Sequence, residues 1–401
     1  MNNKNETSNH QEFDKIKKIY VVIMSLYELA DKLFGAIYIA FMRSQGLTII
    51  QISRLFSIEQ ILLAIFDYPT GAISDKRGRK RIAAYGFIVW GIGILQFAFS
   101  SSFWLFLPGM VLMALGLALI SGAPSSWLID QMISYGVYEK RSHIFPKIRA
   151  SIQFFAVIAS IASYFLIDIG VRFPIITAGF ISIIAGIFAL AVGQDNYGEV
   201  KGINIFSTLI IHLNDFVKEN KLILLSLRIV IRHVPFVAFV LYWQIYATEI
   251  IGLDMKYLPF FLLIFMVLLM LGNYSVSIFS NKINSIMISI LGIFISIFGF
   301  ALLFIFKSIP TFIIAAGLVE LGFGVEQAAT STWTCDYIKS ETRATYSSIF
   351  STIQAVAGFV IINLLGLITE SISVNIAWIV AIVAMILDIL ILVIFYIKYK
   401  A

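Results

Sequence analysis

The sequence predicts an all-α membrane protein with twelve transmembrane helices in two pseudo-symmetric six-helix bundles. The 401 residues are 60% hydrophobic and only 13% charged, whereas soluble domains are closer to half apolar and a quarter charged. The apolar residues form blocks of about 20, long enough to cross the hydrocarbon core of a bilayer as helices. These blocks do not alternate with period two, which argues against the strands of a barrel.

The predicted spans follow one another with short connections. They cover roughly residues 19–43, 50–73, 82–101, 104–128, 147–168, 172–193, 222–247, 256–278, 284–306, 310–333, 345–368 and 373–397. The longest connection mixes charges and separates the halves. The expected organisation is a cytoplasmic tail (1–18), a first bundle (19–193), a cytoplasmic central loop (194–221), a second bundle (222–397) and a short cytoplasmic tail (398–401).

The distribution of Lys and Arg predicts the orientation. Most of these residues fall in the amino-terminal tail, in the loops 76–81 and 140–149, and in the central loop. Because cytoplasmic loops carry the excess of basic residues, both termini are expected in the cytoplasm of a multi-pass plasma-membrane protein. Topology therefore accounts for the net charge of +6, and no nucleic-acid partner is expected. We expect no removable signal peptide, and the single cysteine allows no internal disulfide.

The two halves repeat at one constant offset of 206 residues. The segment GLALISGAPSSWLID at 116–130 aligns with GFGVEQAATSTWTCD at 322–336, so that Gly116 matches Gly322 and Trp127 matches Trp333. The same shift places GL at 46–47 on GL at 252–253, and SDK at 74–76 on SNK at 280–282. An even number of spans per half predicts parallel repeats, an arrangement found in transporters with a site between the halves.

A basic motif follows the second span. The stretch YPTGAISDKRGRKR at 68–81 resembles the loop motif of the major facilitator superfamily, G-x-x-x-D-(R/K)-x-G-R-(R/K). It lies between the second and third of twelve predicted spans, and the resemblance in fold covers essentially the whole chain. The matching residues are Gly71, Asp75, Lys76, Gly78, Arg79 and Lys80. The resemblance implies a gating latch. Gly71 would let the second span approach the eleventh, Asp75 would lie at the amino end of the eleventh, and Arg79 would reach Asp130.

Two departures from the pattern of drug exporters weaken the expectation of drug efflux but do not exclude it. Drug exporters of the superfamily often carry an arginine where this chain has Met113, and a G-P-x-x-G-G pattern that the fifth span lacks. The alternative to a gating role is that the basic motif only fixes the orientation of the chain in the membrane. Trp127 and Trp333 are expected to be interfacial anchors, with a binding cage as the alternative.

Charged residues inside the predicted spans are the candidates for substrate binding or proton coupling. A charge at the centre of a membrane helix costs about 2.5–3.5 kcal/mol on insertion scales. Glu28, Asp31 and Lys32 share one face of the first span. The other candidates are Glu59, Arg228, Arg232, His233 and Glu320, with Glu326 and Asp388 as further interior acids. We expect Glu28, Asp31 and His233 to face one another between the halves, with Asp31 first among the coupling groups. A static, neutralised cluster is the alternative.

The expected function is secondary transport of a small solute by alternating access. Interior acids outnumber interior bases, which favours proton-coupled export of a cationic or neutral amphiphile. The alternative is proton-coupled uptake of a small organic or anionic metabolite, with Lys32 and Arg228 or Arg232 as counter-charges. A transporter-like receptor or scaffold is a lesser alternative, and no pattern for a membrane enzyme is found. We expect no cofactor and no metal, contacts with membrane lipids, and a monomer.

Overall fold

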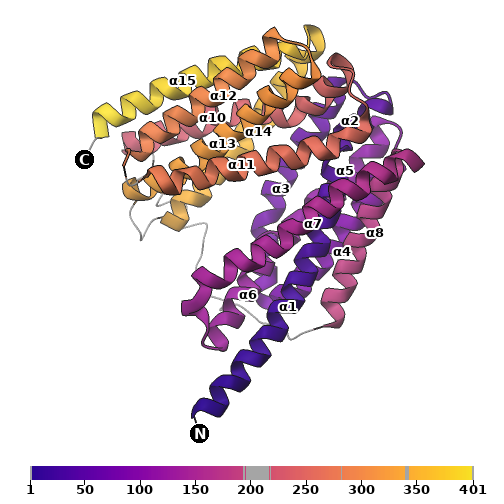
Figure 1. Cartoon of the computed structure of the whole chain (residues 1–401), viewed down its shortest axis with the longest axis vertical. Helices are drawn as coiled ribbons and strands as arrows, with labels where there is room; N and C mark the ends of the chain where they lie inside the picture. The colour runs from indigo at the N-terminus through magenta and orange to yellow at the C-terminus, as the bar shows by residue number, and fades with distance from the viewer. Residues whose placement is uncertain are drawn as a thin grey trace. The chain divides into compact units, whose positions relative to one another are not determined.

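The computed structural model describes residues 2–192, 195, 216, 218–280, 282–338 and 343–399, and the regular elements described are all helices. Side chains are described except at residues 2–10, 68, 72, 75, 142, 335, 336, 343–345 and 348. The chain separates into two compact units, residues 1–47 with 58–201 and residues 48–57 with 202–401. Each unit is built as a bundle of helices (Figure 1).

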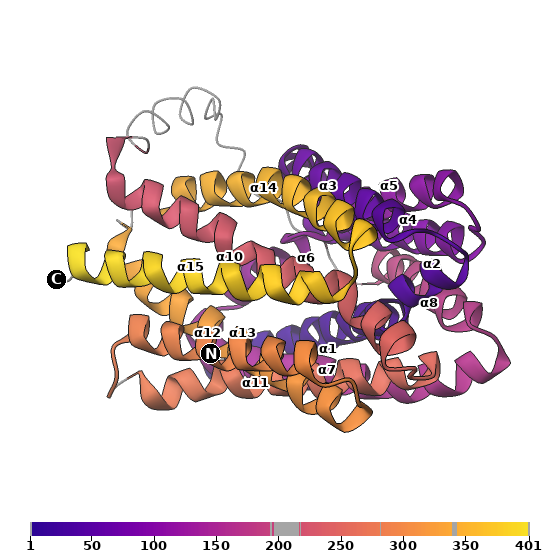
Figure 2. The same cartoon turned by 90° about the horizontal axis from the view of Figure 1, so that it is seen from above.

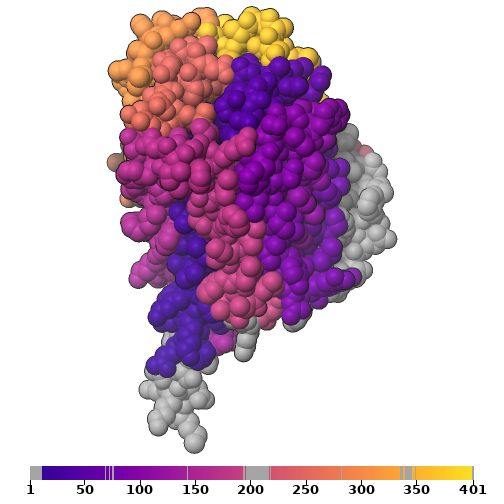
Figure 3. Space-filling view, turned by 90° about the vertical axis from the view of Figure 1, so that its right-hand side faces the viewer, coloured from indigo at the N-terminus to yellow at the C-terminus, as the bar shows by residue number. Residues whose placement is uncertain are grey.

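Unit 1 holds the helices of the first half. They are α1 (Asn2–Gly35), α2 (Tyr38–Ser44), most of α3 (Ile49–Arg77), α4 (Arg79–Ala98), α5 (Phe103–Ile120), α6 (Ala123–Ser134), the short 3₁₀ turn η1 (Tyr138–Lys140), α7 (Arg141–Ile169) and α8 (Arg172–Ala191). Helix α1 packs along α7 and α8, and α4 packs on α5 and α8. In Figure 3, α1 runs over the surface between the magenta α7 and the pink α8.

Unit 2 holds the helices of the second half. They are α10 (Asn220–Ile245), the π turn η2 (Tyr246–Ile250), the 3₁₀ turn η3 (Met255–Tyr257), α11 (Leu258–Phe279), α12 (Ser285–Ile305), α13 (Ile309–Tyr337), α14 (Arg343–Ser371) and α15 (Asn375–Tyr399). These helices run side by side in both views (Figures 1 and 2). Helix α13 packs on α11 and α12, and α10 packs on α14 and α15.

The first turns of α3 belong to unit 2 because they are fastened to α10 and α14. The Glu370 carboxylate accepts hydrogen bonds from the backbone N–H groups of Ile49, at 2.8 Å, and Ile50, at 3.3 Å. A carboxylate is favourable there because helix amino ends present unpaired N–H groups and a positive dipole end. The Tyr242 hydroxyl lies 3.4 Å from the Ser53 hydroxyl and 3.2 Å from that of Thr369.

The length and hydropathy of the helices agree with the predicted class of multi-spanning membrane protein. Within the described residues, eleven helices are long and apolar enough to cross a bilayer. The first predicted span, 19–43, is not among them because Glu28, Asp31 and Lys32 lower its hydropathy. Along α15 the exposed apolar side chains recur with helical spacing, for example Ile379, Val383, Ile386, Leu390, Ile394 and Ile397. Such a stripe is suited to contact with lipid tails.

Two predicted elements differ from the structure. Residues 2–18, predicted as a tail, are helical and continuous with the first span in α1, and Phe13 and Ile16 are buried in a hydrophobic cluster with α6 and α7. The fourth span, predicted without a break over 104–128, is interrupted between α5 and α6. Gly122 has a left-handed φ of 70°, and Pro124 lacks the N–H that a continuous helix would need.

The packing of consecutive helices repeats at the predicted offset of 206 residues. A Cβ atom on Gly116 of α5 would lie 2.5 Å from the Trp90 nitrogen of α4. Its partner Gly322 of α13 lies equally close to α12, where a Cβ would be 2.5 Å from the Gly292 carbonyl oxygen and 2.7 Å from the Ser296 nitrogen. Ser296 is the residue 206 positions after Trp90. Small residues thus bring matching helix pairs together in both units.

Trp127 and Trp333 are not exposed anchors. They keep only 1% and 2% of their surface exposed, so the prediction of an interfacial role was wrong. Trp127 packs in the cluster beside Phe13, and the indole N–H of Trp333 donates to Ser289 at 3.1 Å. Trp127 lies on the side of α6 that faces α1, and Trp333 lies on the side of α13 that faces α12, so both rings point into the protein rather than toward lipid.

Candidate functional site

Four charged side chains meet inside unit 2 and are called the charge cluster here: Arg228 and Arg232 on α10, Glu326 on α13 and Asp388 on α15. The two arginines are four residues apart, so they project from one face of α10. Three helices therefore supply the cluster, which is buried except for Arg232, whose side chain is 31% exposed.

The charge cluster is internally balanced. Glu326 bridges both arginines, 2.5 Å from Arg228 through Oε1 and 3.0 Å from Arg232 through Oε2. Asp388 Oδ1 lies 3.0 Å from Arg228 Nε. The Thr330 hydroxyl donates to Glu326 at 2.7 Å. Two positive and two negative groups cancel, and buried charges persist only when they are paired in this way.

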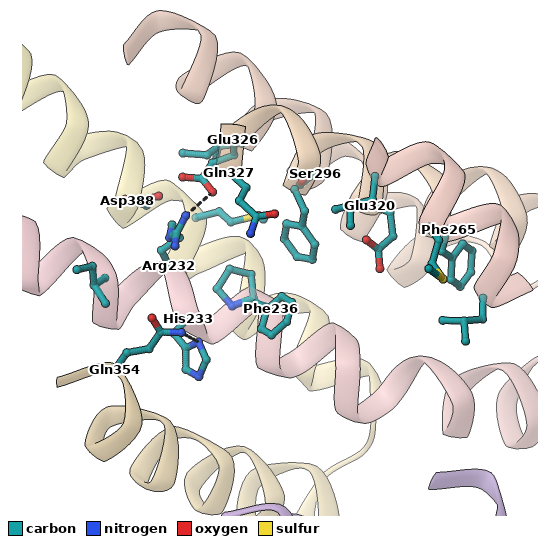
Figure 4. A pocket seen from close by; sticks show the side chains of 18 residues that line it. Arg232, His233, Phe236, Phe265, Ser296, Glu320, Glu326, Gln327, Gln354 and Asp388 are labelled. Carbon is teal, nitrogen blue, oxygen red and sulfur yellow. Dashed lines mark hydrogen bonds and ion pairs between the residues drawn. The ribbon is translucent and has the colours of Figure 1, made fainter. Parts of the chain in front are cut away.

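A cavity of about 360 Å³ opens beside the charge cluster, within the 300–1,000 Å³ range of small-molecule sites. Figure 4 shows its walls. It is lined by Ile229, Arg232, His233, Pro235, Phe236, Leu262, Phe265, Met266, Leu269, Ile293, Ser296, Glu320, Phe323, Glu326, Gln327, Gln354, Met385 and Asp388. Apolar and aromatic residues predominate, and the few polar groups come from α10, α12, α13, α14 and α15.

Glu320 differs from the other acids of the cavity. Among the described residues its carboxylate has no hydrogen-bond or ion-pair partner. It precedes Glu326 by six residues on α13, a separation of about 9 Å along the helix axis. In Figure 4 it points into the cavity near Phe265, away from the labelled arginine. An unpaired carboxylate at membrane depth is costly and is therefore a functional candidate.

His233 is the second unusual group. It is 8% exposed, its Nδ1 lies 3.3 Å from Gln354 Nε2, and its Nε2 is buried without a hydrogen-bond partner. The assignment of the Gln354 amide makes Nδ1 the acceptor, which places the ring proton on Nε2. The ring stacks on Phe236, with centroids 6.0 Å apart.

The predicted cluster of the first span is paired. Lys32 Nζ lies 2.6 Å from Asp31 and 3.7 Å from Glu28. Glu59, on α3, has no hydrogen-bond or ion-pair partner within the part of the chain that the structure describes. The predicted approach of Glu28 and Asp31 to His233 would join the two units and stays a prediction.

The basic motif is held together inside unit 1. Arg79 forms an ion pair with Asp130, as the resemblance implied. Gly78 has φ +101°, a conformation that favours glycine, and the backbone N–H groups of Lys80 and Arg81 donate to Asp195 at 2.9 and 3.1 Å. Asp195 therefore caps the amino end of α4.

The gating role of this motif stays a prediction. The side chain of Asp75 lies outside the described residues. A Cβ on Gly71 would have no atom within 4 Å, so local packing does not explain a glycine there. Lys76 is exposed, and the ammonium of Lys80 donates to the carbonyl of Val192.

Comparison with known proteins decides the family. A family model described as the Major Facilitator Superfamily matches residues 20–362. The chain belongs to the major facilitator superfamily. Members of this family are multi-pass membrane transporters of small molecules and are generally not enzymes. The uncharacterized MFS-type transporter YxaM of Bacillus subtilis (strain 168) is 25% identical over 187 residues, which are 45% of this chain and 46% of that one.

Solved structures share the major facilitator fold at low identity. A variant of the nucleoside transporter NupG has a TM-score of 0.82 and 12% identity, over 94% of this chain and 100% of that one. A bacterial homolog of the human lysosomal transporter Spinster has a TM-score of 0.70 and 14% identity, over 96% of this chain and 95% of that one. A POT family transporter in complex with a thioalcohol-conjugated peptide has a TM-score of 0.73 and 12% identity, over 96% of this chain and 97% of that one.

The sequence identifies most charged groups of this superfamily member but not their partners. The substrate-binding or proton-coupling role of Arg228 and Arg232 stays a prediction, and the structure shows that Glu326 and Asp388 pair with them. A signal was present, because two arginines on one buried helix face require two interior acids elsewhere. No sequence signal indicated Asp195 as a helix cap, or the aromatic walls of the cavity.

Proposed function

We propose that this protein exports a cationic or neutral amphiphilic compound by alternating access, in exchange for protons, with the substrate bound in the cavity of unit 2. The observation that carries the proposal is Glu320, an unpaired carboxylate in an aromatic cavity. We place the protein in the plasma membrane with both termini in the cytoplasm, on the basis of its Lys and Arg distribution.

Charge balance supports a cationic substrate. Because the charge cluster is neutral as a whole, the cavity carries one net negative charge whenever Glu320 is deprotonated. A cation entering from water would neutralise it, and the rings of Phe236, Phe265 and Phe323 would cover an apolar body. The electrostatic attraction is strong in a region where lipid and protein exclude water.

Proton exchange follows from the same group. Glu320 can hold either a proton or a cation, so release of one is linked to uptake of the other. The titratable or charged groups that share its cavity are Arg232 and His233 from α10, Glu326 from its own helix, and Asp388 from α15. Helices α11, α12 and α14 contribute no charged group to it. In unit 1, Glu59 and the paired Glu28, Asp31 and Lys32 remain candidates for a second coupling site.

Uptake of an anionic metabolite is the second candidate. It is favoured by the partial exposure of Arg232, which faces the same cavity and has donor groups beyond its contact with Glu326. An anion would have to overcome the net negative charge of the cavity, which is why export of a cation comes first.

Purified protein in liposomes tests the proposal. A panel of tetraphenylphosphonium (cation), uridine (neutral) and benzoate (anion) is first screened by thermal stabilisation. Tetraphenylphosphonium flux is then followed under an imposed pH gradient. We expect gradient-driven accumulation by the wild type and by Glu139→Gln, a matched control at a side chain that is 93% exposed. Glu320→Gln should bind the cation weakly and lose the accumulation. Stabilisation by benzoate alone, or unchanged accumulation by Glu320→Gln, would reject the proposal.

A further inference from the structure

The cavity of unit 2 has two chemically different ends. Glu320 stands at one end and the Arg232–Glu326 pair at the other, about 9 Å apart along the axis of α13. His233 follows Arg232 directly on α10 and lines the same end. Figure 4 shows the two ends on opposite sides of Phe236.

The Glu320 end accepts hydrogen bonds and offers no donor to satisfy its carboxylate. Its neighbours in Figure 4 are Phe265 and Ser296. The Ser296 hydroxyl is already used, since it donates to the Val319 carbonyl at 3.1 Å. A ligand group at this end must therefore bring its own positive charge or N–H donors, as an ammonium group does.

The opposite end carries no net charge, because Glu326 and Asp388 balance the two arginines, and it offers a hydrogen-bond donor. His233 Nε2 is buried and unpartnered, and with the proton assigned to it this nitrogen needs an acceptor. The charge of Arg232 is paired with Glu326, and Gln327 adds an amide to the wall. An uncharged acceptor such as a carbonyl or ether oxygen fits here. An ammonium group would have to be desolvated beside carboxylates already paired with arginines, and it would leave His233 unsatisfied.

The middle of the cavity suits a flat apolar body. Phe236 and Phe323 lie with ring centroids 6.2 Å apart at an angle of 56°, which leaves ring faces and edges for a ligand. Met266 and Met385 complete the wall, and flexible thioether side chains adapt to ligands of different outline.

From this polarity we infer that the cavity selects monocations that carry an uncharged hydrogen-bond acceptor across a flat apolar body from the cationic group, and that it rejects dications. The inference rests on the proposed function, because it names the substrate class of that site. It goes further in assigning the acceptor-binding role to His233 and the exclusion of a second charge to the balanced charge cluster, which has no uncompensated carboxylate to offer.

Four compounds on one skeleton test the inference. They are 4-acetylphenethylamine (cation with acceptor), 4-ethylphenethylamine (cation without acceptor), 4-ethylacetophenone (acceptor without cation) and 4-(2-aminoethyl)benzylamine (dication). Binding is measured by calorimetry on the full-length protein in lipid nanodiscs. We expect the acetyl amine to bind roughly tenfold more tightly than each of the others, since each charged or buried hydrogen bond contributes a factor of this order.

Two variants test which end of the cavity binds the ammonium group and which binds the acceptor. Glu320→Gln should abolish the preference of the acetyl amine over 4-ethylacetophenone. His233→Phe should abolish its preference over 4-ethylphenethylamine, while the dication gains nothing. If His233→Phe does not fold, the wild-type ranking of the four compounds still decides.

Equal or tighter binding of the dication, equal binding of all four compounds, or binding of none of them overturns the inference. Its failure is distinct from failure of the proposed function. Gradient-driven cation flux with the wrong ranking rejects only the inferred substrate class. The expected ranking without gradient-driven flux rejects only proton-coupled export.

Discussion

Neutralising one member of the charge cluster should strongly destabilise unit 2. We expect Asp388→Asn to lower the free energy of unfolding by about 3–5 kcal/mol, the usual cost of leaving a buried charge without its partner. Asp388 lies 3.0 Å from Arg228, and both side chains are 3% exposed. After the substitution Arg228 would retain only Glu326, whose charge already balances Arg232, so one buried positive charge would be uncompensated.

The same reasoning ranks the other members. Arg228→Met should cost as much as Asp388→Asn, because it leaves two buried carboxylates facing one arginine. Arg232→Gln should cost less, because its side chain is 31% exposed and water can solvate what remains. The double variant Arg228→Met with Asp388→Leu removes a matched pair. It should recover most of the free energy of unfolding that either single variant loses, since apolar replacements of a buried ion pair are often neutral.

Thermal unfolding in detergent measures these differences. A cost of 3–5 kcal/mol corresponds to a fall of roughly 6–20 °C in the unfolding midpoint for a bundle of this size. Glu320→Gln is the matched control. It also neutralises a carboxyl of the cavity, but one without a partner, so its midpoint should stay within about 2 °C of the wild type or rise. An unchanged midpoint for Asp388→Asn, or a larger loss for Arg232→Gln than for Arg228→Met, would refute the assigned pairing.

Three further predictions concern unit 1. Gly116→Val should destabilise by about 1–3 kcal/mol through overpacking against α4, whereas Gly35→Ala, where a Cβ has no atom within 4 Å, should not; thermal unfolding separates the two. Asp195→Ala should cost about 1 kcal/mol by removing the cap of α4, and a midpoint equal to that of wild type would contradict the cap. Asp130→Asn should cost less than about 1 kcal/mol, because its ion pair with Arg79 is partly exposed, yet slow gradient-driven flux several-fold; normal flux would leave the basic motif as an anchor.

Much of the fold could be predicted from the sequence because it depends on local composition. Apolar blocks of about 20 residues must become helices in lipid, whatever surrounds them. The repeat was equally accessible, since Gly116 and Gly322 meet the same requirement for close helix packing at matching positions. The break between α5 and α6 was not predicted, although Pro124 is a local signal for it, and the repeat is broken here because the counterpart of Pro124, Thr330, lies inside the continuous helix α13.

The candidate site depended on the tertiary structure. The sequence by itself determined that acids and arginines lie within the membrane-spanning helices. Only the packing of α10, α13 and α15 decided that Arg228 pairs with acids 98 and 160 residues away, which leaves Glu320 alone. Hydrophobic periodicity reports which residues lie within the membrane. It carries no information on which side chains from distant helices come within ion-pair distance, because that is set by helix rotation and close packing.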